Sequence, residues 1–525
     1  MNRETFLQAI ATRREAWDIA VIGGGATGAG IAVDAASRGF SVVLLEQNDF
    51  GKGTSSRSTK LVHGGVRYLQ QGNLPLVIEA LKERGLLLQN APHLVRNLEF
   101  VVPNYQWWEA SFYGVGLKMY DLLAGRHGFG PSKILSRQEV LAHIPMLKPA
   151  GLRGGVVYHD GQFDDSRLLI NLLQTATEQG AVVLNYARVT SLAKSAAGVV
   201  NGLTFRDEES GLEHALSARC VINATGPFCD QLRRLDDASA RPMIAPSQGV
   251  HIVLPPEFLP GKSAIMVPHT RDGRVMFAVP WHGHVVVGTT DTPIPAVSLE
   301  PRPQAREVDF ILQAAGCYLA RPPKRIDILS VFTGIRPLVK TKSASGTAAL
   351  SRDHTIQVSH SGLLTIAGGK WTTYRKMAED AVDRAIKLAS LPERTCITKD
   401  LPVHGSGGRL EDSGLLANYG SDAGLIAGLI RERPGLATPL HKYLPVCGAQ
   451  IVWAARHEMA RTLDDVLARR TRALFLNARA ALAMAPAAAR LMAATLGRDE
   501  AWAKSQLTAF HQIVSGFLPN PADAV

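Results

Sequence analysis

Cysteine is scarce in this sequence of 525 residues, which has five cysteines, an odd number, and no C-x-x-C pair. A secreted disulfide framework and a zinc site built on paired cysteines both require more cysteine at closer spacing. We therefore expect a protein of a reducing, cytosolic compartment. The five residues are Cys220, Cys229, Cys317, Cys396 and Cys447.

Long hydrophobic runs are also lacking. The first 18 residues carry charges throughout and have no apolar stretch of the kind found in an export signal. The longest uncharged apolar window nearby, residues 19–33, is short for a membrane span and contains five glycines. The sequence therefore predicts a cytoplasmic protein without a transmembrane helix.

Charged residues make up 20% of the chain, and 57 basic against 46 acidic residues leave a net charge of +11. This excess is not collected in a basic tail, so we expect no nucleic acid; it suits solubility, anionic substrates or an anionic lipid surface. Residues 457–461 read HEMAR and lack the second histidine of a zinc helix, and no G-x-x-x-x-G-K-[ST] loop occurs. We expect neither a metal nor ATP.

A nucleotide-binding signature is present near the N-terminus. A β-branched run at residues 18–22 leads directly into Gly23, Gly25 and Gly28, and an alanine-rich helical segment follows. Glu46 ends a second apolar run 18 residues after the last glycine, where it could accept a hydrogen bond from a ribose hydroxyl. Strand, glycine turn and helix predict a dinucleotide site in which the helix N-terminus faces a pyrophosphate.

Two later elements indicate FAD rather than NAD. Residues 221–227, VINATGP, predict a strand that runs into a turn of the kind flavoproteins use near the adenine end. Residues 366–375, IAGGKWTTYR, could bring another helix N-terminus toward the flavin. The N-terminal signature and these two elements together give the expected cofactor contacts, which are Gly23, Gly25, Ala26, Thr27, Gly28, Glu46, Ala224, Thr225, Gly226, Gly368, Gly369, Lys370, Trp371 and Thr372.

The order of the elements predicts an α/β protein with a doubly wound parallel sheet, a second, mixed sheet and a helical C-terminal part. Strand patterns recur up to residue 366, whereas a linker rich in Pro, Gly and Ser at residues 398–410 is followed by helical patterns such as residues 464–482. The expected division is a discontinuous FAD-binding domain (1–85, 150–235 and 325–395), a substrate domain (86–149 and 236–324) and a helical cap domain (396–525).

Several long motifs stand in the order found in the FAD-dependent, respiratory glycerol-3-phosphate dehydrogenases, and the chain resembles that family over nearly its whole length. The motifs are GGGATGAGIAVDAASRG, TSSRSTKLVHGGVRYL, INATGP, GTTDTP, GIRPL and AGGKWTTYRKMAED, and residues 456–472 resemble the family's helical cap. The resemblance implies a glutathione-reductase-like FAD domain. It also implies oxidation of sn-glycerol 3-phosphate to dihydroxyacetone phosphate, with hydride passing from C2 to flavin N5 and electrons passing to a membrane quinone.

The implied reaction needs cations for a phosphate and a titratable group for a hydroxyl proton. Arg336 resembles the arginine that the wider superfamily places over the flavin, where its planar fork can hold an anionic or polar substrate. We interpret Arg67 and Tyr68 as phosphate contacts, and Lys370 as a phosphate contact or a stabiliser of charge on the flavin. Thr373 is expected to add a hydroxyl donor.

The proton acceptor is left open between His63, which precedes two glycines, and His251, on a probable strand. Asp291 could orient a base or cap a turn. The resemblance also implies cofactor contact at the loop after the second strand and at the turn before Arg336. These residues are Thr54, Ser55, Ser56, Arg57, Ser58 and Gly334.

Aromatic residues are few, at 6% of the chain, yet six of them fall within residues 105–120. This cluster suits a peripheral contact with an anionic membrane or a quinone vestibule, or else a packed layer or a dimer face. We expect a homodimer attached peripherally to the cytoplasmic membrane. Two alternatives stay open: an oxidase that acts on the same substrate, uses oxygen and releases peroxide, and a non-enzymatic FAD-binding scaffold.

Overall fold

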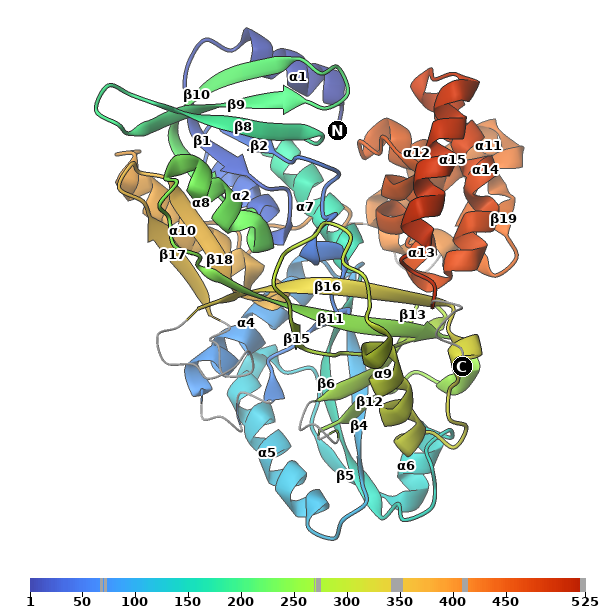
Figure 1. Cartoon of the computed structure of the whole chain (residues 1–525). Coiled ribbons are helices and arrows are strands. Elements are labelled where there is room, and N and C mark those ends of the chain that lie inside the picture. Colours follow the sequence, from blue (N-terminus) through green and yellow to red (C-terminus); the bar gives the residue numbers. More distant parts are fainter. Residues whose placement is uncertain are drawn as a thin grey trace.

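The computed structural model describes residues 1–66, 69, 73–268, 270, 275–340, 353–407 and 414–519. Figure 1 shows two sheets with helices around them and a separate group of C-terminal helices beside them. The helices are α1 (Arg3–Thr12), α2 (Ala26–Ser37), α4 (Leu74–Asn90), α5 (Glu109–Ala124), α6 (Arg137–His143), α7 (Asp165–Glu178), α8 (Cys229–Asp236), α9 (Ala305–Tyr318), α10 (Tyr374–Leu388), α11 (Ala423–Glu432), α12 (Gly448–His457), α13 (Ala473–Leu476), α14 (Ala478–Leu496) and α15 (Glu500–Val514).

The first sheet has eight strands in the order β17-β18-β10-β1-β2-β7, with β8 and β9 added beside β10. The strands from β18 to β7 run parallel, while β17, β8 and β9 pair antiparallel with their neighbours. This is the doubly wound sheet that the sequence predicts. Its strands are β1 (Trp17–Ile22), β2 (Val42–Leu45), β7 (Val182–Leu184), β8 (Ala187–Lys194), β9 (Val200–Asp207), β10 (Glu213–Asn223), β17 (His354–Val358) and β18 (Leu364–Gly368).

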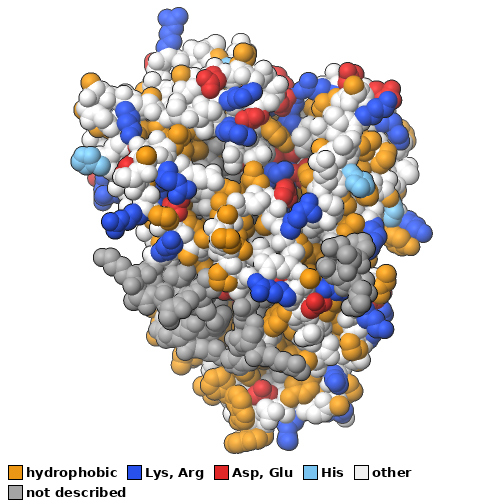
Figure 2. All heavy atoms as spheres, viewed as in Figure 1, with side chains coloured by type: hydrophobic (Ala, Val, Ile, Leu, Met, Phe, Trp, Pro, Cys, Tyr) orange, Lys and Arg blue, Asp and Glu red, His pale blue; other side chains and the backbone are white. Residues whose placement is uncertain are grey.

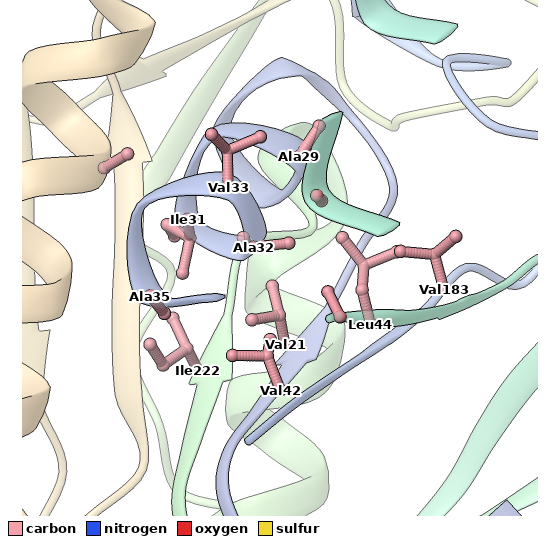
Figure 3. Close-up of a cluster of buried hydrophobic side chains, with 14 of the residues drawn as sticks. Val21, Ala29, Ile31, Ala32, Val33, Ala35, Val42, Leu44, Val183 and Ile222 are labelled. Atoms are coloured by element: carbon pink, nitrogen blue, oxygen red, sulfur yellow. The ribbon is translucent and has the colours of Figure 1, made fainter. Parts of the chain in front are cut away.

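Helix α2 is buried on almost all sides because it lies between this sheet and two other helices. Figure 3 shows its side chains, among them Ala32, above Val21 and Leu44 of the sheet. All three are inaccessible to solvent, and burying a valine or leucine contributes roughly 1.5–3 kcal/mol. The turn before α2 is therefore fixed in position by a dry core.

The second sheet has ten strands and is mixed, because β12 pairs parallel with β4 while the other pairs are antiparallel. In Figure 1 it lies below the first sheet, with β11 and β16 between the two layers. Its strands are β3 (Leu61–Val62), β4 (Val95–Asn104), β5 (Lys133–Ser136), β6 (Gly154–Phe163), β11 (Ile244–Leu254), β12 (Ala264–Val267), β13 (Met276–Trp281), β14 (His284–Gly288), β15 (Thr292–Pro293) and β16 (Ser330–Val339).

Three strands lie on the other side of the expected division. β3, β6 and β16 fall in segments that we assigned to the FAD-binding domain, yet all three belong to the ten-stranded sheet. β16 pairs with β11 over ten positions, from Ile244 opposite Val339 to Val253 opposite Ser330. Local composition cannot indicate a pairing between strands this far apart in the chain. The division into domains therefore stays a proposal.

The C-terminal part is helical, with one short hairpin of β19 (Pro439–His441) and β20 (Leu444–Cys447). The helical pattern expected over residues 464–482 is present, and it is divided among three helical elements. A π-helical turn at Asp465–Arg470 is followed by α13 and α14, because Arg472 takes a positive φ of 63°. Among the described residues, no helix combines the length and the apolar composition needed to cross a bilayer.

Buried charges join this helical part to the first sheet. Asp49, in the loop after β2, accepts from Arg469 Nε at 2.5 Å and from Arg470 Nη1 at 2.7 Å. Arg167 of α7 pairs with Glu458, after α12, in the same way. Although burial opposes it, the two arginines hold the pKa of Asp49 below its usual value. The helical part is thus docked through groups that water does not screen.

Candidate active site

A cavity of about 650 Å³ lies where the two sheets meet, and the glycine-rich turns of the first sheet open into it. Its volume is within the range of ligand and cofactor sites. Most of the residues predicted from the sequence line it: Gly23, Gly25, Ala26, Thr27, Glu46, Thr54, Ser55, Arg57, Ser58, His63, Ala224, Thr225, Gly226, His251, Asp291, Gly334, Arg336, Gly368, Gly369, Lys370, Trp371 and Thr372.

The remaining predicted residues are placed differently. Ser56 is buried, and its carbonyl accepts hydrogen bonds from Lys60 Nζ at 2.8 Å and Arg472 Nη2 at 2.9 Å. Thr373 is also buried and donates to the carbonyl of Lys370, so its geometry does not support the expected hydroxyl contact with substrate. Both side chains lie outside the cavity lining because their turns fold inward. Arg67 and Tyr68 lie outside the described residues.

The turn between β1 and α2 has the form of an anion site. α2 begins after Gly25, which has no side chain to cap the N–H groups of the first turn. A Cβ on Gly28 would lie 1.9 Å from the Gly23 carbonyl oxygen, so only glycine lets the helix approach the strand. Gly28 therefore acts through packing and does not itself line the cavity.

Glu46 and Ser55 complete this turn. Glu46 accepts hydrogen bonds from the N–H groups of Gly24 at 2.7 Å and Asn48 at 2.9 Å, and burial raises its pKa above the usual value. Ser55 Oγ accepts from the N–H of Ala26 at 2.9 Å. The N-terminus of α2, glycine clearance and an acidic residue at the end of β2 fit the pyrophosphate and ribose of a bound FAD.

Arg57 lines the cavity, but its guanidinium is engaged in the protein. It pairs with Glu300 at 2.8 Å and donates to the carbonyl of Thr333 at 3.2 Å. Direct contact with a cofactor is therefore not the main use of this side chain. It holds the loop after β2 against β16.

Arg336, on β16, is held by acceptors on one side while it lines the cavity. It donates to Asp291 at 3.2 Å, to Thr289 Oγ1 at 3.1 Å and to the Thr290 carbonyl at 3.0 Å. A Cβ on Gly249 would lie 2.6 Å from Arg336 Nη2, so the glycine makes room for the guanidinium. The sequence did not single out Gly249, whose role depends on the β11 and β16 pairing. Asp291 thus orients the arginine.

His251, on β11, is buried and its ring stacks on Phe332 with centroids 4.7 Å apart. Its Nε2 lies 2.9 Å from Thr59 Oγ1. Burial, and then the charges of Arg336 and Lys60, lower the pKa of His251 well below its usual value. The ring is therefore neutral and can accept a proton, but it is a weak base in this state.

The turn at residues 63–65 and the turn at residues 368–373 are joined at the cavity wall. The N–H of His63 donates to Thr372 Oγ1 at 3.1 Å, and this hydroxyl lies 3.4 Å from the His63 carbonyl. The indole N–H of Trp371 donates to the carbonyl of Ser55 at 2.8 Å. The third glycine-rich element therefore ties the His63 turn to the cofactor loop.

Lys60 lies in the motif at residues 54–69, but we assigned it no role from the sequence. It is fully buried, has a positive φ of 67°, and donates to Asp165 at 2.7 Å. Burial lowers the pKa of Lys60 to about 7, although Asp165 opposes the shift. Arg472, from the helical part, also donates to Asp165 at 2.9 Å. These contacts join segments hundreds of residues apart, so no local signal could have predicted them.

Comparison with known proteins agrees with this site. Residues 18–375 match the family described as FAD dependent oxidoreductase, and residues 396–503 match the C-terminal domain of alpha-glycerophosphate oxidase. A mitochondrial glycerol-3-phosphate dehydrogenase from Arabidopsis thaliana is 42% identical over 97% of this chain and 87% of its own. The rat mitochondrial enzyme is 41% identical over 96% and 73%.

The chain belongs to the FAD-dependent glycerol-3-phosphate dehydrogenase family. The crystal structure of the glycerol-3-phosphate dehydrogenase from Bacillus halodurans, complexed with FAD, covers 98% of this chain with 97% of its own, at a TM-score of 0.80 and 29% identity. The expected fold class, enzyme class and cofactor are confirmed. The L-alpha-glycerophosphate oxidase from Mycoplasma pneumoniae is 17% identical with a TM-score of 0.56, which is a likeness of fold alone.

Proposed function

We propose that this chain oxidises sn-glycerol 3-phosphate to dihydroxyacetone phosphate and passes the electrons to a membrane quinone. Bound FAD supplies the hydride acceptor in such a reaction. The carbon oxidised is C2, which loses a hydride, while its hydroxyl loses a proton to the protein. Two observations support this proposal. The relatives from Arabidopsis thaliana and rat are named glycerol-3-phosphate dehydrogenases. The cavity is lined by Arg336, whose guanidinium is oriented by Asp291.

The observation that carries the proposal is the placement of Arg336. Asp291 and the backbone after β14 hold its guanidinium so that little side-chain freedom is lost when an anionic or polar substrate binds. A guanidinium can donate two parallel hydrogen bonds to such a group. We propose that Arg336 and Lys370, which line the cavity, bind the substrate. The assignment of phosphate binding to Arg67 and Tyr68 is a proposal from the sequence alone.

The proton acceptor is proposed to be one of the two histidines. His251 is neutral because burial, and then the charge of Arg336, lower its pKa. His63 lines the cavity from the turn that Thr372 holds. Replacing each by asparagine separately and recording the pH dependence of flavin reduction distinguishes them, because only the true base removes the acidic limb of the profile.

An anaerobic titration with sn-glycerol 3-phosphate tests the reaction. We expect the flavin absorbance to bleach and to return quickly with a ubiquinone analogue and slowly with air. Rapid recovery in air with stoichiometric peroxide would favour the oxidase, whose C-terminal domain model this chain also matches. An absorbance unchanged by substrate would overturn the proposal, and a non-enzymatic FAD-binding scaffold would then account for the fold.

We also propose peripheral attachment to an anionic membrane through α5 and its surroundings. Figure 2 shows hydrophobic side chains gathered at the lower end of the molecule, where Figure 1 places α5. Trp107 is 79% exposed and Leu122 is 81% exposed. The other exposed apolar side chains here are Trp108, Phe112, Val115, Met119 and Ile134.

Basic side chains accompany this apolar surface. Lys118 on α5 and Lys133 on β5 are both exposed, so the surface can contact anionic headgroups as well as acyl chains. Co-sedimentation with vesicles of phosphatidylcholine and phosphatidylglycerol tests it, with the double substitution Trp107→Ser and Leu122→Ser expected to abolish binding. If the variant instead changes only the oligomeric state in solution, the surface belongs to the proposed homodimer. The proposed location is the cytoplasmic side of the membrane.

A further inference from the structure

The backbone of the His63 turn is connected to a buried charge pair through a single hydroxyl group. The N–H of Gly64 donates to Tyr120 Oη at 2.8 Å, and Tyr120 Oη donates to Asp160 Oδ2 at 2.8 Å. Arg84 Nη1 donates to the other oxygen of the same carboxylate, Asp160 Oδ1, at 2.7 Å. Tyr120 comes from α5, Arg84 from α4 and Asp160 from β6. Three separate elements therefore converge on one turn.

The three side chains that make these contacts are buried. Tyr120, Arg84 and Asp160 are each at most 2% exposed. Burial and the neighbouring Asp160 carboxylate raise the pKa of Tyr120 well above its usual value. The hydroxyl therefore stays protonated and donates a hydrogen bond to Asp160. Without the hydroxyl, the Gly64 N–H would lose an acceptor, and Asp160, which also lines the cavity, would lose a donor.

Packing leaves the turn no alternative position. A Cβ on Gly64 would lie 2.5 Å from Tyr120 Oη and 2.6 Å from Leu81 Cδ2. On the opposite side, the His63 N–H is bonded to Thr372. The turn is thus held between α4 and α5 on one side and the 368–373 turn on the other, and the side chain that it presents to the cavity is His63.

We propose that Tyr120 is a positioning residue for substrate oxidation. It lies outside the cavity lining that the described residues form, and it acts by holding Gly64, and through Gly64 the neighbouring His63, at the distance that proton removal and substrate placement need. The inference rests on the proposed function. It adds a role for α5 that is separate from the exposed apolar side chains on its outer face.

Tyr120→Phe tests this role, because it removes the hydroxyl and keeps the ring. We expect the rate of flavin reduction at saturating sn-glycerol 3-phosphate to fall about tenfold or more, with flavin content unchanged. Tyr113→Phe is the matched control. Tyr113 lies on the same helix and in the same apolar cluster, and its ring packs against Phe112 at 5.4 Å. This control is expected to stay within about twofold of wild type.

Hydrogen exchange shows whether the loss of rate comes from the turn at residues 63–65 or from a general loss of stability. In Tyr120→Phe we expect faster exchange confined to the peptide with residues 61–66, while the peptide of β1 and α2 exchanges as in wild type. A reduction rate within twofold of wild type, or an equal loss in Tyr113→Phe, would overturn the inference. If Tyr120→Phe loses flavin, its hydrogen exchange decides the question, because exchange at residues 61–66 equal to that of wild type would also overturn the inference.

The two proposals fail in different ways. If sn-glycerol 3-phosphate does not reduce the flavin of the wild-type protein, the proposed function is wrong, and the role of Tyr120 in substrate oxidation is wrong with it. If wild type is reduced and Tyr120→Phe is reduced equally fast, only the positioning role is wrong.

Discussion

Two glycine turns face the same cavity and are stabilised in different ways. In the turn between β1 and α2, Gly24 donates to Glu46, 22 residues away, and Gly28 packs against Gly23. In the turn at residues 63–65, Gly64 donates to Tyr120, 56 residues away, and His63 to Thr372, 309 residues away. The turn between β1 and α2 is therefore stabilised by local sequence, and the turn at residues 63–65 by distant segments.

The largest effect is expected at the local turn. Gly28→Ala places a Cβ 1.9 Å from the Gly23 carbonyl oxygen, so α2 must move away from β1. The N–H groups at the start of α2 then no longer point at the pyrophosphate site. We expect flavin content below about a tenth of wild type, measured from absorbance per protein. Gly424→Ala, in α11 and outside the cavity lining, is the control, because its Cβ would meet no protein atom within 4 Å. Full flavin in Gly28→Ala would contradict the placement of the pyrophosphate.

The docking of the helical part should give the next effect. Asp49→Ala leaves Arg469 and Arg470 buried without their common partner, and breaking such a pair costs about 3–5 kcal/mol. Urea unfolding measures this loss. Glu15→Ala, at an exposed pair, is expected to change stability by less than about 0.5 kcal/mol. Equal stability of the two variants would mean that the helical part is docked by other contacts.

Arg336 tests the proposed substrate site directly. Arg336→Ala is expected to lower kcat/KM at least about a hundredfold, because an oriented, charge-assisted contact is lost in the transition state. Steady-state kinetics with a soluble quinone analogue measures it, with flavin content as a check. Arg321→Ala removes an exposed arginine paired with Asp327 and should leave kcat/KM unchanged. Near-normal turnover in Arg336→Ala would remove this residue from the site.

The smallest effect concerns the segment that leads into the helical part. His404 lies between Asp422 at 3.0 Å and Glu178 at 2.5 Å, and these carboxylates raise its pKa above the usual value although burial opposes them. Its stabilisation is therefore complete below about pH 6.5 and lost as pH rises through the raised pKa. We expect the Tm difference between wild type and His404→Gln to shrink from pH 6 to pH 8. A difference that grows with pH would contradict this sign.

The same contrast explains which residues the sequence could indicate. Gly23, Gly25 and Glu46 stand at a fixed spacing beside a strand and a helix, so their pattern was readable and all three line the cavity. Thr373 stands in an equally recognisable motif, yet its side chain turns inward because the short turn at residues 371–373 buries it. A motif indicates that a segment is at the site, and the backbone then decides which side chains face it.

Relations between distant segments were missed. Lys60 and Arg472 lie in recognised motifs, but their meeting at Asp165, and the space that Gly249 clears for Arg336, join segments far apart in the chain. The break within the helical pattern of residues 464–482 was missed for the same reason. Arg472 leaves the helical conformation where its side chain reaches Ser56 and Asp165.

By itself the sequence determined the parallel sheet with its glycine turns, the FAD class and the family, because strand, turn and helix propensities and the spacing of glycines act over short distances. The tertiary structure alone decided the orientation of Arg336 by Asp291, the neutral state of His251, and the connection of Tyr120 to Gly64 and Asp160. These depend on desolvation and on contacts between distant elements, which exist only when the sheets and helices have packed.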